Sequence, residues 1–221
     1  MTATSTRTGG RASEPGSETT LVRWFGGAAG PVLVAAVATQ AVTRDGFRLA
    51  DHPLSLLALG PNGWIQTATF LAVGASFASA GWLATRAGIT TSRWALWLIV
   101  VFGASMIVAG LFPADPWNRF PPGAVEETTI IGVIHNAAAG IGGLSLIAAA
   151  GLSARFHHQR GHTKRRSIAA TAAAASLILG AAGSGSQDFR IAFAGGAVSW
   201  LWASYELAIS PPETETVHVN R

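Results

Sequence analysis

Three parts of this sequence carry side chains able to do chemistry, and they lie far apart in the chain. The stretch DHPLS at positions 51–55 places a carboxylate, an imidazole and a hydroxyl within five residues. Asp115 lies between two prolines, and His135 lies inside a long apolar run. Imidazole and carboxylate groups bind zinc and also act as general acids and bases. A site that combined His52, Asp115 and His135 would be a metal centre or an acid–base centre.

No local motif decides between these two chemistries. The chain has no His-Glu-x-x-His pattern, no Gly-x-Ser-x-Gly elbow, no P-loop and no dinucleotide fingerprint. It also has no cysteine, so disulfides, thiolate ligands and a thiol nucleophile are excluded. A divalent metal such as zinc is therefore a candidate cofactor for His52, Asp115 and His135 that no spacing specifies.

The composition is that of a membrane protein. Of the 221 residues 49% are hydrophobic and only 12% are charged, whereas soluble domains carry about 25% charged residues. The apolar residues form blocks near the ~20 residues that a helix needs to cross a bilayer. We therefore predict an all-α, polytopic bundle of six transmembrane helices at 22–42, 64–84, 94–112, 128–151, 167–186 and 190–210. Residues 1–21 are predicted to be a disordered tail and 211–221 a second tail.

The basic residues predict the orientation of the bundle. Most of the 15 lysines and arginines lie in the N-terminal tail, in loops 85–93 and 152–166, and at the C-terminus. Because cytoplasmic loops are enriched in Lys and Arg, both termini are predicted to be cytoplasmic, with the protein in the inner (plasma) membrane. The cluster at 155–166 is then expected to contact anionic lipid headgroups. The positions of these charges favour membrane topology over nucleic-acid binding.

This orientation places the polar residues of three loops on the same extracytoplasmic side. In the first loop we expect Asp51 to cap a short helix that ends at Gly60, and Ser55 to share one edge of that helix with Asp51 and His52. The candidate ligand-binding residues on this side are Asp51, Ser55, Trp64, Asp188 and Arg190. The edge is either the wall of a polar pocket or only the surface of an interfacial helix.

His135 is expected about 10 Å below the outer end of the fourth span, at 1.5 Å per residue. Its neighbours on the same helix face are small, so the ring should point into the bundle and away from lipid. An ionisable residue inside a span is a functional hypothesis by default. The alternative is a neutral imidazole bonded to Ser55, to Asn62 or to a backbone carbonyl.

The stretch HPLSLLALGPNGWIQ, the segment AGLFPADP and the histidine of the fourth span together resemble a bacterial six-helix membrane family, catalogued as domain of unknown function 998. The resemblance covers about residues 22–210. It implies a polytopic inner-membrane protein and no established activity. The positions that match the family pattern are His52, Ser55, Gly60, Trp64, Asp115, Pro116 and His135.

Three functional hypotheses follow from the sequence. The first is a membrane protein that binds a ligand or lipid, or has an accessory role, through an extracytoplasmic polar pocket formed by His52, Ser55, Asp115 and His135. The second is a membrane-embedded, metal-dependent hydrolase acting on a lipid-like substrate. The third is a small-molecule transporter, although no paired half-repeats are visible in the spans. Whether the protein is an enzyme and whether it forms an oligomer stay open.

Overall fold

The structure is a computed structural model that describes residues 17–209. The predicted tails at 1–16 and 211–221 lie outside the described residues, while the last residues of the predicted 1–21 tail form helix α1. The prediction of an all-α fold is confirmed. The elements in order are α1 (Ser17–Leu21), the π-helical turn η1 (Val22–Gly26), α2 (Gly27–Thr43), the 3₁₀ helix η2 (Leu54–Ala58), α3 (Gly63–Arg86), α4 (Arg93–Leu111), α5 (Ile130–Gln159), α6 (Thr163–Ser186) and α7 (Phe189–Ile209).

Five segments within residues 17–209 are long and apolar enough to cross a membrane, so the chain is a multi-pass membrane protein. They are Glu18–Thr43, Gly63–Arg86, Arg93–Leu111, Ile130–Gln159 and Thr163–Ser186. The sixth predicted span corresponds to α7, which is not among them. This helix carries Ser199, Ser204 and Glu206, and all three are buried among neighbouring helices. Its polar residues therefore lower its hydropathy without facing lipid.

The predicted basic loop at 152–166 is wrong in its extent. Helix α5 continues to Gln159 and α6 begins at Thr163, so only a tight turn remains between them. The sequence suggested a loop because Arg155, His157 and His158 interrupt the apolar pattern. His157 is completely buried, so this interruption belongs to the interior of the bundle.

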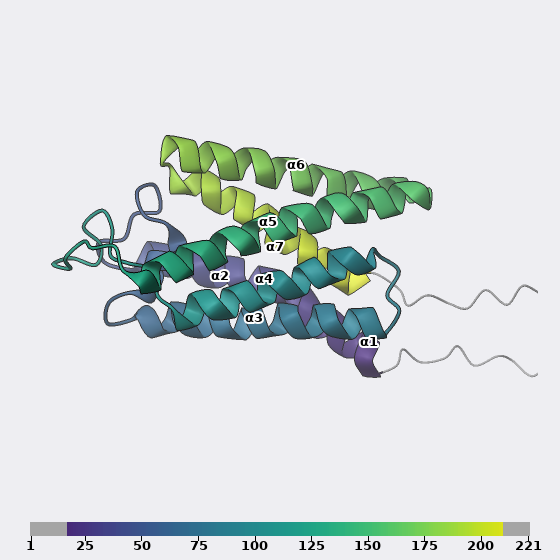
Figure 1. Ribbon diagram of the computed structural model, residues 1–221, viewed down its shortest axis with the longest axis horizontal. Helices are drawn as coiled ribbons and strands as arrows, with labels where there is room; N and C mark the ends of the chain where they lie inside the picture. The colour runs from purple at the N-terminus through teal and green to yellow at the C-terminus, as the bar shows by residue number, and fades with distance from the viewer. Residues whose placement is uncertain (1–16, 210–221) are drawn as a thin grey trace, which may run out of the picture.

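The helices form an elongated bundle in which α3, α4, α5, α6 and α7 follow one another as neighbours and α7 packs against α2 (Figure 1). One end of the bundle, called the loop end here, carries segments 44–62 and 112–129 and the turn 187–188. The other end, called the basic end, carries α1 and the turns 87–92 and 160–162. Thus the candidate residues of all three loops lie at one end, as the sequence predicts.

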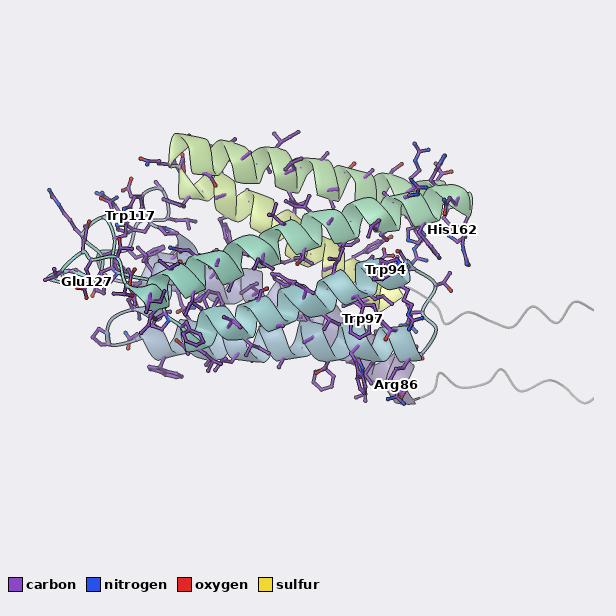
Figure 2. The ribbon with its side chains drawn as sticks, viewed as in Figure 1. Arg86, Trp94, Trp97, Trp117, Glu127 and His162 are labelled. Carbon is purple, nitrogen blue, oxygen red and sulfur yellow. The ribbon has the colours of Figure 1, made fainter. Side chains whose placement is uncertain are left out.

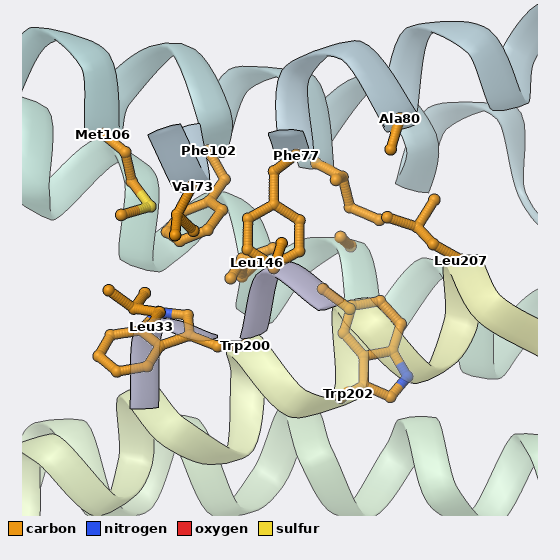
Figure 3. Packing of buried hydrophobic residues seen from close by; sticks show 14 of the residues in the cluster. Leu33, Val73, Phe77, Ala80, Phe102, Met106, Leu146, Trp200, Trp202 and Leu207 are labelled. Atoms are coloured by element: carbon orange, nitrogen blue, oxygen red, sulfur yellow. The ribbon is translucent and has the colours of Figure 1, made fainter. Parts of the chain in front are cut away.

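Large side chains from several helices fill the middle of the bundle (Figure 3). Leu33, Phe77 and Leu146, from α2, α3 and α5, are almost completely buried. Gly30 allows α2 to approach α7, because a Cβ atom there would collide with the carbonyl of Trp200. The Gly30 amide also donates a 2.8 Å hydrogen bond to Ser204 Oγ. Such small-residue contacts hold membrane helices together where the lipid supplies no hydrophobic driving force.

Candidate functional site

His52 joins the two long loops of the loop end. Its Nδ1 accepts a 2.9 Å hydrogen bond from the backbone amide of Arg48, so Nε2 carries the proton and donates to the carbonyl of Asn118 at 3.1 Å. The ring is 3% exposed and packs between Phe47 and Phe120. Because both ring nitrogens are already used, this geometry gives His52 a structural role.

The expected cap of the short helix is wrong. The 3₁₀ helix η2 has Pro53 at its N-cap and no side-chain cap, while Asp51 forms an ion pair with Arg48 at 2.5 Å. At the other end of η2, Arg44 donates hydrogen bonds of 2.6 and 2.8 Å to the carbonyls of Leu57 and Leu59. The Arg48–Asp51 ion pair and the two hydrogen bonds from Arg44 therefore stabilise this loop, and Asp51 does not cap the helix.

Three other candidate ligand residues face away from an interior site. Trp64, at the start of α3, is 68% exposed on the surface of the bundle. Asp188 and Arg190 pair with each other through hydrogen bonds of 3.0 and 2.6 Å. The Arg190 guanidinium lowers the pKa of the Asp188 carboxyl below its usual value. Phe189, between them, is the residue of this turn that reaches the site described below.

Asp115 is bound to the N-terminus of α5. Its carboxylate accepts hydrogen bonds from the Thr129 hydroxyl at 2.6 Å and the Thr129 amide at 2.9 Å. Thr129 in turn caps α5, accepting a 3.1 Å hydrogen bond from the Gly132 amide. The bonds from the hydroxyl and then the amide of Thr129 lower the pKa of the Asp115 carboxyl below its usual value. The carboxylate therefore stays ionised at neutral pH, where it complements the positive end of the α5 dipole.

His135 points into the bundle, as the small residues on its helix face predict, and is 1% exposed. Its Nδ1 lies 3.0 Å from the carbonyl oxygen of Ala109 and 2.8 Å from that of Phe112. Carbonyl oxygens only accept, so Nδ1 carries the proton and donates to the unpaired carbonyls at the end of α4. Of the alternatives open from the sequence, the backbone-carbonyl partner is confirmed. In the neutral ring Nε2 is then an acceptor, and the hydrogen bonds given for this ring within residues 17–209 are those of Nδ1.

His52, Asp115 and His135 therefore have separate partners. Among residues 17–209, no group of three or more His, Cys, Asp or Glu side chains is placed to hold a metal ion. His52 fastens two loops, Asp115 holds the start of α5, and His135 holds the end of α4. The structure does not bring these three residues together as a shared ligand set.

A mostly apolar cavity of about 270 Å³, called the inner cavity here, lies among the helices of the bundle. Side chains of α2, α3, α4, α5 and α7 line it, among them Phe70, Phe102 and Trp200. Its polar lining consists of four residues, Ser55, Ser105, His135 and Ser199. Apolar walls with a few polar groups are typical of sites for small ligands.

A second, polar hollow of about 520 Å³, called the vestibule here, lies beside the inner cavity at the loop end. The two share Pro53, Ser55 and Phe189 in their walls. The remaining vestibule wall includes Asp115, Trp117, Glu126, Glu127, Thr128 and Asn136. Trp117 and Glu127 are seen at the loop end in Figure 2, far from Trp94 and His162 at the basic end. Of the residues singled out from the sequence, Ser55, Asp115 and His135 thus line this pair of cavities, whereas His52 and Trp64 do not.

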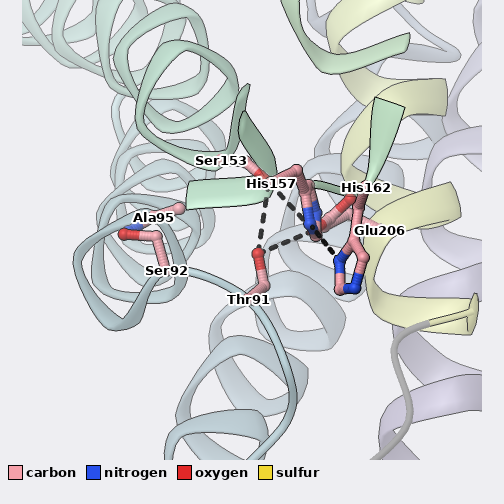
Figure 4. A network of polar contacts seen from close by, with 7 residues as sticks. All are labelled: Thr91, Ser92, Ala95, Ser153, His157, His162 and Glu206. Atoms are coloured by element: carbon pink, nitrogen blue, oxygen red, sulfur yellow. Dashed lines mark hydrogen bonds and ion pairs between the residues drawn. The ribbon is translucent and has the colours of Figure 1, made fainter. Parts of the chain in front are cut away.

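A buried polar cluster at the basic end was not predicted from the sequence (Figure 4). Glu206 on α7 is 1% exposed, and its Oε1 accepts hydrogen bonds from Thr91, Ser153 and His157 at 2.6, 2.9 and 2.8 Å. The other ring nitrogen of His157 lies 3.4 Å from Nδ1 of His162. The signal in the sequence was a glutamate inside an otherwise apolar block together with histidines inside the basic cluster.

Comparison with known proteins places the chain in a family without assigning a role. No curated protein and no solved structure matches it significantly. The family model described as "Protein of unknown function (DUF998)" matches residues 28–207, which include all of α3, α4, α5 and α6 and the part of the first span from residue 28 onward. The residues that resemble this family, including Ser55, Asp115 and His135, all lie inside the match. The chain belongs to the DUF998 family of multi-pass membrane proteins.

Proposed function

We propose that this protein binds a lipid-like ligand with a single chain, placing the chain in the inner cavity and the polar end in the vestibule. The observation that carries the proposal is the common wall of the two hollows, made by Pro53, Ser55 and Phe189. An apolar chamber that adjoins a polar one matches the two halves of an amphiphile. Their volumes, about 270 and 520 Å³, are comparable with the ~300–1,000 Å³ of small-molecule sites.

The composition of each hollow supports this division of the ligand. Aromatic and aliphatic side chains dominate the inner cavity. Moving an alkyl chain from water into this cavity is favourable, because it removes apolar surface from water. The vestibule instead has carboxylates, hydroxyls and an amide in its wall. The polar end of a ligand therefore keeps its hydrogen bonds there.

We further propose that α7 is the sixth span and that the loop end is extracytoplasmic. The positively charged side chains of Arg86, Arg93, Lys164 and Arg166 belong to the basic end, and cytoplasmic ends are enriched in such residues. In this orientation the cavity opens toward the outer half of the membrane. The turn 160–162 and its neighbouring basic residues then face the anionic headgroups of the cytoplasmic leaflet.

A hydrolase that uses His52, Asp115 and His135 receives less support from this geometry. A general base needs a free nitrogen or oxygen within hydrogen-bond reach of its substrate, and both nitrogens of His52 are occupied. Binding requires only the cavity and its polar rim, so a binding role is the function that the geometry supports best.

A photoactivatable fatty alcohol with a diazirine in its chain tests the proposal. In the detergent-purified full chain it should label peptides of α5 and α7 that border the inner cavity. Gly143→Leu should abolish most of this labelling, because Gly143 lines the cavity and a Cβ atom there meets open space. Gly140→Leu is the matched control, since Gly140 lies on the same helix, also has open space, and does not line the cavity. Equal labelling of the wild type and both variants would contradict the proposal.

A further inference from the structure

The vestibule has an uneven charge that defines the headgroup it accepts. Its wall contains the carboxylates of Asp115, Glu126 and Glu127, and no lysine or arginine is among its lining residues within 17–209. Hydrogen bonds lower the pKa of the Asp115 carboxyl, and Glu126 accepts a 2.8 Å hydrogen bond from the Arg119 amide. Both interactions leave the negative charges in place, because their donors are neutral groups.

Aromatic rings complete the same wall. Trp117 and Phe189 come from different segments and meet edge to face, with ring centroids 5.6 Å apart. Both line the vestibule. The faces of aromatic rings attract cations such as ammonium groups, with Trp the strongest. Carboxylates and aromatic rings in one wall therefore favour a positively charged ligand and disfavour an anionic one.

His135 supplies an independent observation from the adjoining cavity. The ring is 99% buried, lines the inner cavity, and uses Nδ1 to hold the end of α4. Nε2 is then the acceptor of the neutral ring, while the hydrogen bonds given for His135 within residues 17–209 are those of Nδ1. The inner cavity therefore combines one imidazole and three hydroxyl groups with a mostly apolar wall, and no carboxylate is among its lining residues within 17–209. It suits the uncharged chain of the ligand, whereas the charged end belongs to the vestibule.

We infer that the ligand is a single-chain amphiphile with a protonated amine at its head. This inference rests on the proposed binding function and adds the chemical class of the ligand. The ammonium group lies in the vestibule beside Glu126, Glu127 and the Trp117 ring, and the chain extends past Ser55 into the inner cavity. A sulfate or carboxylate headgroup in the same place would face carboxylates and be repelled.

Competition against the diazirine fatty alcohol tests which headgroup the protein prefers. The competitors are decylamine, decanol and decyl sulfate, added to the full chain in a detergent with an uncharged headgroup. Decylamine should displace the photoprobe at about tenfold lower concentration than decanol, which corresponds to about 1.4 kcal/mol, and decyl sulfate should be weakest. Added salt should reduce the advantage of decylamine, because exposed charges are screened.

Two charge-neutralising variants identify the source of the preference. Glu126→Gln retains the acceptor for the Arg119 amide, and Glu127→Gln changes an exposed side chain. Together they should remove most of the tenfold advantage of decylamine and leave competition by decanol unchanged. Asp45→Asn is the matched control, because Asp45 is an exposed acid of the loop end that does not line the vestibule.

The outcomes distinguish failure of this inference from failure of the proposed function. If decylamine and decanol compete equally in the wild type, or if the preference survives the Glu126→Gln/Glu127→Gln double substitution, the amine headgroup is wrong and the binding cavity stands. If the Gly143→Leu variant is labelled at the α5 and α7 peptides as strongly as the wild type, the inner cavity is not the binding site and both proposals are wrong. A preference for decylamine that depends on Glu126 and Glu127 supports both.

Discussion

Glu206 and His157 meet at the basic end through a 2.8 Å hydrogen bond, with both side chains essentially inaccessible to solvent. Glu206 belongs to α7 and His157 to the last turn of α5, so the contact joins two helices that are not consecutive in the chain. Thr91, from the turn before α4, donates to the same carboxylate oxygen at 2.6 Å. The cluster therefore connects α7 to α5 and to the turn before α4 at the basic end.

We predict that Glu206→Ala lowers the free energy of unfolding by about 3–5 kcal/mol, as is usual when one member of a buried polar pair is removed. Thr91→Val should cost about 1.5–3 kcal/mol, the range for a hydrogen bond to a charged group. Denaturant titration of the detergent-purified protein measures both. Asp45→Ala, an exposed acid, should stay within about 0.5 kcal/mol of the wild type. A wild-type stability for Glu206→Ala would mean that the cluster contributes nothing to folding.

The capping of α5 by Asp115 predicts a dependence of stability on pH. Because the folded-state pKa of this carboxyl is lowered, its contribution is fully present above its unfolded-state pKa of about 3.9 and is lost as pH falls through the folded-state value. Asp115→Asn should therefore lower the melting temperature at pH 7, and the difference from wild type should shrink toward pH 3. A difference that is constant between pH 7 and pH 3 would show that the carboxylate charge has no role.

Two glycines of α5 are predicted to respond in opposite directions to the same substitution. Alanine is favoured over glycine in a helix by about 1 kcal/mol, so Gly140→Ala, which meets open space, should raise the melting temperature. At Gly132 a Cβ atom would overlap the Asp115 carboxylate, so Gly132→Ala should lower it. Thermal unfolding of the two variants side by side measures this. A stabilised Gly132→Ala would show that Asp115 does not lie against this turn.

His52 and His135 are predicted to differ in their effect on ligand binding. His52→Ala should destabilise the protein, because Asn118 loses its contact and Phe120 loses a packing partner, and should leave the affinity for the photoprobe unchanged. His135→Ala should lower both stability and labelling, because His135 lines the cavity. Labelling is measured at a temperature where each variant is folded. Equal loss of labelling in both variants would place His52 in the binding site.

The proposed orientation can be measured directly, because the chain has no cysteine of its own. Val125→Cys, at a position that is 78% exposed in the loop end, should react with an impermeant maleimide in intact cells. Lys164→Cys, exposed at the start of α6, should react only after the membrane is permeabilised. The reverse pattern of labelling would invert the topology.

The helices were predictable because each membrane-spanning segment is a continuous apolar block, and the observed starts of α3 and α4 differ from the prediction by one residue. The end of α5 was predicted too early, because the prediction followed the apolar block and α5 continues beyond it to Gln159. Hydrophobicity falls after Gly151, yet Ser153 and His157 continue the helix because Glu206 satisfies them. Apolar pattern alone does not distinguish a polar residue in a loop from one with a partner inside the bundle.

The candidate site was predictable only in part. The small residues around His135 correctly indicated that the ring is buried, and the loops were correctly gathered at one end. The hydrogen-bond partners of these residues could not be predicted, because they lie far away in the sequence. Glu206 bonds to Thr91 across 115 positions, and His52 bonds to Asn118 across 66. Residue type suggested metal binding for His52, whereas its neighbours Arg48 and Asn118 use both of its nitrogens.

Helix α5 runs without interruption from Ile130 to Gln159, about 45 Å at 1.5 Å per residue. On this helix His135 borders the cavity and His157 is bonded to Glu206, about 33 Å further along the axis. One continuous helix therefore connects the buried cluster at the basic end with the wall of the inner cavity, so we expect a substitution that loosens the Glu206 cluster to change the position of that wall as well.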